Sequence, residues 1–292
     1  MKPPPFDYHR PNTVGEALEL LARFAGDASI LAGGQSLVPM MNMRLAEPPV
    51  LIDINRIPQL TGVVSEAEGF IVGAMTRQRA IEESPVLRNG QPLLLEAVSH
   101  IGHVMVRNRG TIGGSLAHAD PAAELGVVAL ALGVEIVLQS SKGKRVIPAD
   151  QFFFGPFMTA RQDNEMITEV RIPARAPGSG WAFLELARTY GNFAVAAACA
   201  IVELTEGTIS NVRLVLGGVA PTPVRAPEAE SLFEGKSPSG GAFREVAEAV
   251  DATIQPTDDA QATAEYRRSV AKVLAGRALQ VAAERAGGDG RR

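Results

Sequence analysis

Two short segments of the chain share one plan, in which an apolar approach leads to a pair of glycines and then to a small hydroxyl residue. The first segment is Ala32-Gly33-Gly34-Gln35-Ser36, and the second is Thr111-Ile112-Gly113-Gly114-Ser115. Paired glycines allow the backbone to adopt φ > 0 and to turn several N–H groups toward one point, which binds oxyanions without a basic side chain. Two such segments that converge can hold both phosphates of a dinucleotide, whereas either one alone is more simply a tight turn after a strand.

Neither segment matches a better-known phosphate motif. The chain has no G-x-x-x-x-G-K-[ST] sequence, which argues against hydrolysis of ATP or GTP. It has no G-x-G-x-x-G that opens a helix and is followed about 20 residues later by an acidic residue, which argues against a Rossmann site for NAD. A nucleophile elbow is missing as well, so no catalytic residue is predicted.

The composition indicates a globular protein without a membrane span. Of the 292 residues, 46% are hydrophobic and 21% are charged, which suits one large core or two moderate ones. No apolar run approaches the roughly 18 residues of a transmembrane helix, and the opening MKPPPFDYHRP lacks the apolar stretch of a signal peptide. A cytoplasmic location is therefore expected. The net charge of −4 argues against nucleic acid as a partner.

Cysteine and histidine usage limits the metal chemistry of the chain. Cys199 is the single cysteine, so the sequence offers no disulfide framework, no zinc-ribbon spacing and no ligand set for an iron–sulfur cluster. We expect it to be a small buried apolar residue. The histidines are too loosely spaced for a metal site, and none is predicted; they are His9, His100, His103 and His118.

The order of the predicted elements favours an α+β fold over a clean βαβ series. A helix is expected over residues 13–24, because Thr13 and Glu16 form a capping box before an apolar stripe. Another helix is expected to start after the second glycine segment, with Asp120 as N-cap and Pro121 at the first helical position. Strands are predicted at 29–32, 50–54, 61–65, 70–75, 134–138, 165–172, 194–204 and 209–216, helices at 91–101 and 264–286, and a linker at 173–180.

Four stretches make the chain recognisable, and together they run through nearly its whole length: FDYHRP, ILAGGQSLVPMMNMRLAEPPVLIDINRI, VRNRGTIGGSLAHADPAAEL and RTYGNFAVAA. The chain resembles the FAD-binding medium subunits of molybdenum hydroxylases, a family typified by aerobic carbon monoxide dehydrogenase and the flavin domain of xanthine dehydrogenase. The resemblance implies an FAD-binding module like that of vanillyl-alcohol oxidase (PCMH-like), made of two α+β subdomains, and then a smaller α+β domain. The expected limits are 1–176 with a subdomain break near 55–60, 177–286, and a flexible tail at 287–292.

The resemblance also implies cofactor contacts, with the two glycine segments as the family's pyrophosphate motifs. Three positions depart from the family pattern: Gln35 stands where several members have His, Ser115 where many have Asn, and Asn192 where Asp is common. Because Gln35 replaces a candidate attachment histidine, FAD is expected to be bound noncovalently. The expected contacts are Leu31, Ala32, Gly33, Gly34, Gln35, Ser36, Leu37, Ile101, Thr111, Ile112, Gly113, Gly114, Ser115, Glu124, Ile167 and Leu184.

The function implied by the resemblance is that of an electron-transfer subunit of an oxidoreductase. Electrons would leave a molybdenum cofactor on a large subunit, cross [2Fe-2S] clusters on a small subunit and reach FAD on this chain, from which an external acceptor takes them. A dimer of heterotrimers is expected, acting on carbon monoxide or an N-heterocycle such as nicotine, a purine or quinoline. Two alternatives are a free-standing flavin oxidase, which needs its own acid/base group, and a non-catalytic binding module whose glycine segments are only turns.

Overall fold

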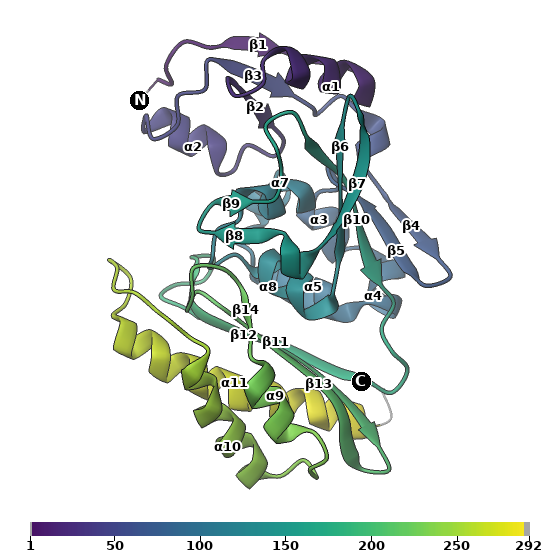
Figure 1. Cartoon of the computed structure of the whole chain (residues 1–292), viewed down its shortest axis with the longest axis vertical. Coiled ribbons are helices and arrows are strands. Elements are labelled where there is room, and N and C mark those ends of the chain that lie inside the picture. The colour runs from purple at the N-terminus through teal and green to yellow at the C-terminus, as the bar shows by residue number, and fades with distance from the viewer. Residues whose placement is uncertain (1, 289–292) are drawn as a thin grey trace.

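Three sheets follow one another along the chain, and Figure 1 shows them stacked from the top of the molecule to the bottom. The computed structural model describes residues 2–288. The first sheet contains three parallel strands, β1 (Asp7–His9), β3 (Val50–Asp53) and β2 (Ala28–Leu31), in this order across the sheet. Its core includes Leu18, Leu21 and Ile52, which are almost fully buried.

The first helix, α1 (Val14–Arg23), confirms the predicted start signal. Thr13 Oγ1 accepts a hydrogen bond from the backbone N–H of Glu16 at 3.2 Å, and Glu16 in turn accepts one from the N–H of Asn12. Satisfying these otherwise free N–H groups is what an N-terminal cap contributes to a helix. Two short helices also belong to this part of the chain. The helix α2 (Leu37–Asn42) follows β2, and η1 (Pro58–Leu60) follows β3.

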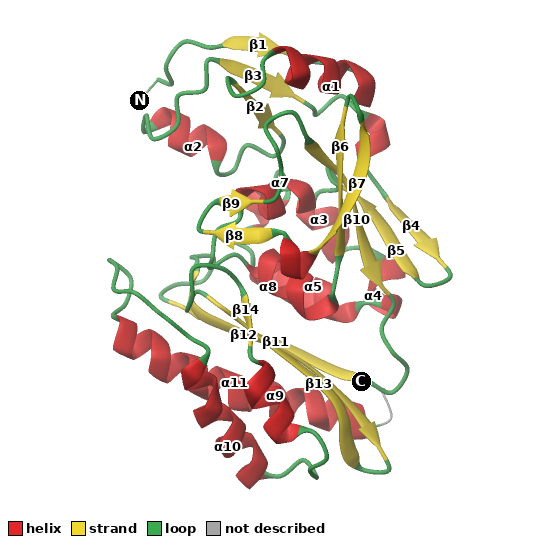
Figure 2. Ribbon diagram, in the orientation of Figure 1, coloured by secondary structure: helices red, strands yellow, loops and turns green. Residues whose placement is uncertain are grey.

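The middle sheet is antiparallel and has five strands. They are β4 (Val63–Glu66), β5 (Gly69–Gly73), β10 (Met166–Pro173), β6 (Glu135–Ser140) and β7 (Gly143–Pro148), in this order. Helices gather beside it (Figure 2): α3 (Gln78–Glu82), α4 (Pro85–Gly90), α5 (Pro92–His100), α6 (Val104–Arg107), α7 (Ile112–His118) and α8 (Glu124–Leu132). After η2 (Ala149–Gln151), a small hairpin of β8 (Phe153–Gly155) and β9 (Met158–Thr159) leads back to the sheet.

The third sheet is also antiparallel and lies between helices on both faces. Its strands are β11 (Gly180–Ala187), β12 (Ala194–Thr205), β13 (Thr208–Gly217) and β14 (Val224–Arg225), in this order. On one face lies α11 (Ala264–Gly287), and on the other α5 and α8 of the preceding part. The helices α9 (Pro227–Phe233) and α10 (Gly240–Ala249), with η3 (Val250–Ala252), complete the C-terminal layer.

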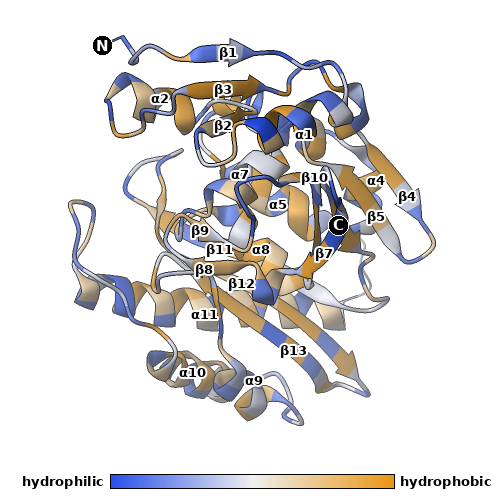
Figure 3. Cartoon of the chain, turned by 45° about the horizontal axis from the view of Figure 1, so that its top comes forward, coloured by the Kyte–Doolittle hydropathy of each residue, from blue (hydrophilic) through white to orange (hydrophobic). Residues whose placement is uncertain are grey.

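This double cover explains the continuous apolar run of β12, which Figure 3 shows as an apolar strand inside the molecule. Successive strand residues point to opposite faces. Ala197 and Cys199 pack with the middle core, whereas Ala198 and Ala200 pack with the C-terminal core. Burial raises the pKa of the Cys199 thiol, as suits a small apolar residue.

One predicted helix start is wrong. Asp120 does not cap a helix; its Oδ1 accepts a hydrogen bond from the N–H of Ala122 at 2.9 Å, which closes a turn. The helix α8 begins at Glu124, and its N-cap is Ala123, three residues after the predicted N-cap. The chain end also differs from expectation, because Gly287 still belongs to α11, while residues 289–292 of the predicted tail lie outside the described residues. Within residues 2–288, no helix is long and apolar enough to cross a membrane.

Candidate cofactor-binding site

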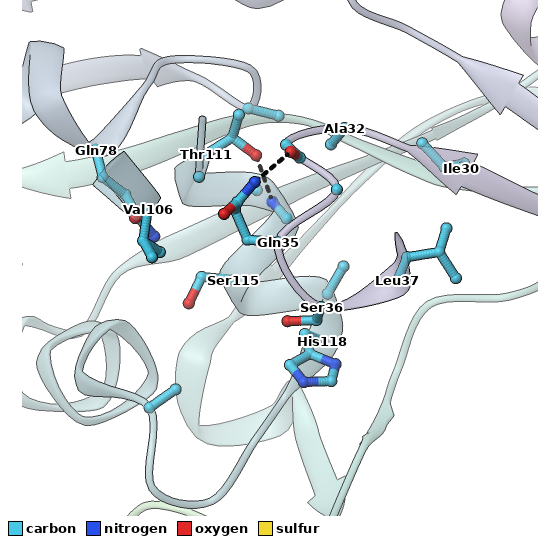
Figure 4. Close-up of a pocket in the computed structure, with 18 of the residues that line it drawn as sticks. Ile30, Ala32, Gln35, Ser36, Leu37, Gln78, Val106, Thr111, Ser115 and His118 are labelled. Carbon is cyan, nitrogen blue, oxygen red and sulfur yellow. Dashed lines mark hydrogen bonds between the residues drawn. The ribbon is translucent and has the colours of Figure 1, made fainter. Parts of the chain in front are cut away.

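A cavity of about 460 Å³ lies where the first sheet, the middle helices and the turn before β12 meet. This volume is within the range of sites for small molecules and cofactors. Both glycine segments line it, as do residues from the end of α5 and from the β11–β12 turn. Figure 4 shows side chains of the first segment close to those at the start of α7. The structure therefore brings together two segments that are far apart in the sequence.

The first glycine segment carries a row of free donors. In the described part of the chain, the backbone N–H groups of residues 33–37 have no hydrogen-bond acceptor. Gly34 has φ of +74°, which lets the chain turn between β2 and α2. The Gln35 side chain donates to the carbonyl oxygen of Gly33 at 3.2 Å, a bond drawn in Figure 4. Consecutive unpaired N–H groups at a turn form the concavity that favours an anion.

The second glycine segment differs from the expectation, because it is the first turn of α7. Thr111 is the N-cap, and its Oγ1 accepts a hydrogen bond from the N–H of Gly114 at 3.1 Å. The N–H of Gly113 donates to the Ala74 carbonyl oxygen at 2.9 Å. Neither glycine has positive φ. The prediction that this pair turns free N–H groups toward a ligand is therefore wrong; the second segment offers the hydroxyl of Ser115 instead.

Small size is what the glycines of the second segment contribute. A Cβ at Gly113 would lie 2.6 Å from the Cβ of Ala74, and one at Gly114 would lie 2.7 Å from Thr111 Oγ1. Real side chains do not approach this closely. Gly113 therefore lets α7 lie directly against Ala74, next to the end of β5, and Gly114 leaves room for the Thr111 cap and for Ala32 of the first segment.

Two side chains outside the segments hold them together. Asn55 Nδ2 donates to the Ala32 carbonyl oxygen at 2.9 Å, and Arg77 Nη2 donates to Asn55 Oδ1 at 2.6 Å. The other Arg77 nitrogen, Nη1, donates to the carbonyl oxygen of Arg109, directly before the second segment. The Asn55–Arg77 pair thus connects the backbones of both segments, and a charge-assisted bond of this kind is stronger than a neutral one.

Asp53 fixes Asn55 of this pair through hydrogen bonds. Its Oδ1 accepts a hydrogen bond from the N–H of Asn55 at 2.9 Å, and its Oδ2 accepts one from the Tyr8 hydroxyl. Burial by itself would raise the pKa of Asp53, but the hydrogen bonds from Tyr8 and Asn55 outweigh it and lower the pKa. Asp53 therefore remains a carboxylate that fixes Asn55 in place.

An acidic group lies on the opposite side of the cavity. Glu124, at the start of α8, is only 4% exposed and lines the cavity. Burial raises the pKa of Glu124 to about 8, and the negative charge of Glu185 adds to the effect. His100 Nδ1 lies 3.4 Å from Glu185 Oε1, and this contact raises the pKa of His100. In contrast, burial lowers the pKa of His118, which also lines the cavity.

Sequence reasoning missed several lining residues. Gln78 is buried, and its Oε1 has no hydrogen-bond partner among the described residues. Arg161 is the only Lys or Arg among the described residues that line the cavity, and its Nη1 donates to backbone carbonyl oxygens of Gln162 and Glu165. No local pattern marks these positions, because only the tertiary fold brings them to the cavity.

Most of the contacts expected from the resemblance line the cavity. Three of them do not. Leu31 is the last residue of β2, Ile112 is buried in the middle core, and Leu184 packs with the C-terminal core on the far side of β11. The expected contacts that line it are Ala32, Gly33, Gly34, Gln35, Ser36, Leu37, Ile101, Thr111, Gly113, Gly114, Ser115, Glu124 and Ile167.

Comparison with known proteins gives the same assignment along almost the whole chain. Residues 4–175 match the family described as FAD binding domain in molybdopterin dehydrogenase. Residues 181–282 match the CO dehydrogenase flavoprotein C-terminal domain. The carbon monoxide dehydrogenase medium chain of Hydrogenophaga pseudoflava is 41% identical over 282 residues, which cover 97% of this chain and 98% of the relative. A caffeine dehydrogenase subunit beta from Pseudomonas is 36% identical, over 98% of this chain and 97% of the relative.

Solved structures agree in fold as well as in sequence. A carbon monoxide dehydrogenase chain from Hydrogenophaga pseudoflava has a TM-score of 0.95 and 42% identity, covering 98% of this chain and 99% of that one. Quinoline 2-oxidoreductase from Pseudomonas putida 86 has a TM-score of 0.94 and 34% identity, over 98% of this chain and 99% of that chain. These matches confirm the fold class and the resemblance noted from the sequence. The chain belongs to the family of FAD-binding subunits of molybdenum-dependent dehydrogenases.

Proposed function

We propose that this oxidoreductase subunit holds one FAD noncovalently in the cavity and passes electrons between a partner chain and an external acceptor. The observation that carries the proposal is the row of free N–H groups at residues 33–37, which faces a cavity of suitable size. When bound, FAD supplies a redox centre that links one-electron carriers to two-electron acceptors. The residues of this chain bind and orient it and control the protons around it.

The residues present fit an FAD. The pyrophosphate is assigned to the N–H groups of the first segment, with the hydroxyls of Ser36 and Ser115 as further donors, and Arg161 supplies positive charge in the lining. A Cβ at Gly33 would lie 2.4 Å from the carbonyl oxygen of Arg109, directly before the second segment. A side chain at this position would therefore push the two backbones apart. The expected contacts that line the cavity are proposed as cofactor contacts on this basis.

We assign the flavin ring to the part of the cavity near Ile101. Gly191, Asn192 and Phe193 of the β11–β12 turn also line the cavity, and Phe193 is 46% exposed. Electron exchange with a partner requires one edge of the ring to reach the surface. The part near Ile30 and Met166 is lined by the first sheet and by β10 and suits the adenine.

Several exposed apolar side chains belong to the cavity lining or are near it in the sequence or structure. This apolar rim consists of Met105, Phe157, Tyr190 and Phe193, all well exposed. Phe193 lines the cavity, Phe157 contacts the ring of the lining residue His118 at 5.1 Å between centroids, and Met105 and Tyr190 directly precede the lining residues Val106 and Gly191. Apolar surface gathered around a functional site is typical of a protein interface. We propose that a partner covers the rim in the assembled enzyme.

The names of the relatives, such as medium chain and subunit beta, imply large and small partners. The only cysteine is buried, so this chain offers no ligands for an iron–sulfur cluster. We propose that a molybdenum cofactor is bound by the large partner and [2Fe-2S] clusters by the small one, in a dimer of heterotrimers. Carbon monoxide or an N-heterocycle is the proposed substrate class, because relatives are named for carbon monoxide, caffeine and quinoline.

The three hydrophobic cores support a division into units. We propose an FAD-binding domain at 1–176 with a subdomain break near 55–60, and a C-terminal domain at 177–286. The first core draws mainly on the first sheet, the second on the middle sheet and its helices, and the third on the C-terminal sheet with α11. The cytoplasmic location stays a prediction.

Identification of the bound cofactor tests the proposal. The purified chain, alone or co-expressed with its partners, should be yellow and carry one FAD. Acid precipitation should release the flavin into the supernatant, because no covalent attachment is expected. Flavin that stays in the pellet would refute noncovalent binding. Recovery of FMN, or of no flavin at all, would refute the assignment of both glycine segments to a dinucleotide.

A further inference from the structure

The cavity contains a buried acid that forms no ion pair. Glu124 is 4% exposed and lines the cavity, and its carboxyl group accepts a hydrogen bond from its own backbone N–H. An ionised carboxyl group in such a place is costly unless it is paired. The largest charge effects on Glu124 come from Glu185, His100 and Asp120. The position favours a carboxyl group that keeps its proton at neutral pH.

Glu185 and His100 extend this group toward the surface. The Glu185 side chain is 7% exposed, and its Oε2 has no hydrogen-bond partner among the described residues. Its Oε1 lies 3.4 Å from Nδ1 of His100, whose side chain is 35% exposed. The negative charges of Glu124 and Glu96 also face His100, and Glu96 is itself paired with Arg285 at 2.8 Å. His100 thus connects the buried carboxyl group of Glu185 with solvent.

We propose that Glu124, Glu185 and His100, called the acid–histidine cluster below, exchange the proton that accompanies reduction of the cofactor. The inference rests on the proposed function, in which FAD occupies this cavity. Iron–sulfur clusters deliver electrons without protons, so a proton must come from elsewhere. The O–H bond of Glu124 breaks, its electron pair stays on the carboxylate oxygen, and the proton goes to the reduced cofactor.

The proton lost from Glu124 is restored from solvent. His100, when charged, gives its Nδ1 proton to Glu185. Glu185, whose charge acts on Glu124, passes a proton to the Glu124 carboxylate, and the imidazole then takes up a proton from water. The directions of the pKa shifts agree with this order, because burial raises the pKa of Glu124 to about 8 and the contact with Glu185 raises the pKa of His100. As an acid, Glu124 has a proton to give below a pH of about 8 and loses this capacity above it.

Rapid photoreduction of the FAD-loaded chain tests the cluster. Flavin absorbance reports protonation of the cofactor, and a pH-indicator dye in weak buffer reports proton uptake from solvent. In the unmodified chain, protonation should precede uptake, and its rate should fall as the pH rises through about 8. In Glu124→Gln, protonation should slow by about 100-fold and coincide with uptake. In His100→Gln, protonation should stay fast while uptake slows.

The matched control is Glu66→Gln, which neutralises an exposed carboxylate on β4 and should change neither signal. If Glu124→Gln does not fold, Glu185→Gln gives a second test. Proton uptake from solvent should be slower in this variant than in the unmodified chain. Rapid cofactor protonation in a folded, FAD-loaded Glu124→Gln chain would overturn the proposal. That result would leave FAD binding intact, whereas a purified chain without flavin would instead refute the proposed function.

Discussion

Replacement of Gly33 by alanine places a methyl group between the two glycine segments. Its Cβ would lie 2.4 Å from the carbonyl oxygen of Arg109 and 2.9 Å from the Cα of Gly110. Ordinary contacts begin at 3.4 Å, so the facing backbone must retreat by about 1.0 Å. No side-chain rotation relieves the contact, because both neighbours are backbone atoms. The Asn55–Arg77 pair opposes the movement, since it connects the two segments.

Overpacking of this kind costs about 1–3 kcal/mol. The strain is relieved when the segments separate, so we expect a folded chain whose FAD affinity is about 5- to 140-fold lower. The assay is titration of the apo-protein with FAD, followed by flavin fluorescence, together with a thermal melt. Gly15→Ala is the control, because its Cβ would meet nothing closer than 3.9 Å. If Gly33→Ala binds FAD as tightly as the control, the close approach of the two segments has no part in cofactor binding.

Two further predictions concern the surroundings of the site. Arg77→Met removes the hydrogen bonds to Asn55 and Arg109 and should weaken FAD binding by about tenfold or more, with partial recovery in Arg77→Lys; equal affinities in all three chains would contradict the role of the pair. Glu124→Gln should make the stability of the FAD-free chain less dependent on pH. The pKa of Glu124 is raised from 4.5 to about 8, so the folded state binds the extra proton and stability falls as the pH rises through this range. The loss is at most about 5 kcal/mol, and chemical unfolding at pH 5 and pH 8 should show a smaller difference for the variant than for the unmodified chain.

Local patterns predicted most of the elements. The capping box at Thr13 and Glu16, the strand at 209–216 and the long C-terminal helix all appear where expected. These signals are local, because they depend on residues a few positions apart. The start of α8 was predicted wrongly because an aspartate side chain can either cap a helix or close a turn. Asp120 closes a turn by accepting a hydrogen bond from the N–H of Ala122.

The glycine segments show how one motif can serve two purposes. The first segment has the expected turn with free N–H groups. In the second, Thr111 starts a helix at once, so Gly113 and Gly114 provide space, and their N–H groups are already paired. Threonine is among the preferred N-cap residues, so Thr111 is a possible helix start that the sequence already offers.

The remaining site residues are brought together only by the fold. Asn55 and Arg77 connect segments more than twenty residues away from each of them, and Glu185 contacts His100 from β11 in the C-terminal part. No periodicity or spacing connects such positions. Leu184 illustrates the same limit, because its neighbour Glu185 faces His100 while Leu184 itself packs toward the C-terminal core.

The division of labour between this chain and its partners is the central claim, and anaerobic stopped-flow measurement of flavin absorbance tests it most directly. The isolated FAD-loaded chain should be bleached by dithionite but not by carbon monoxide, caffeine, nicotine or quinoline. After reconstitution with the molybdenum and iron–sulfur subunits, the substrate of the complex should bleach the same flavin. If a substrate reduces the flavin of the isolated chain as quickly as that of the complex, the chain is an oxidase in its own right and the account of an electron-transfer subunit is wrong.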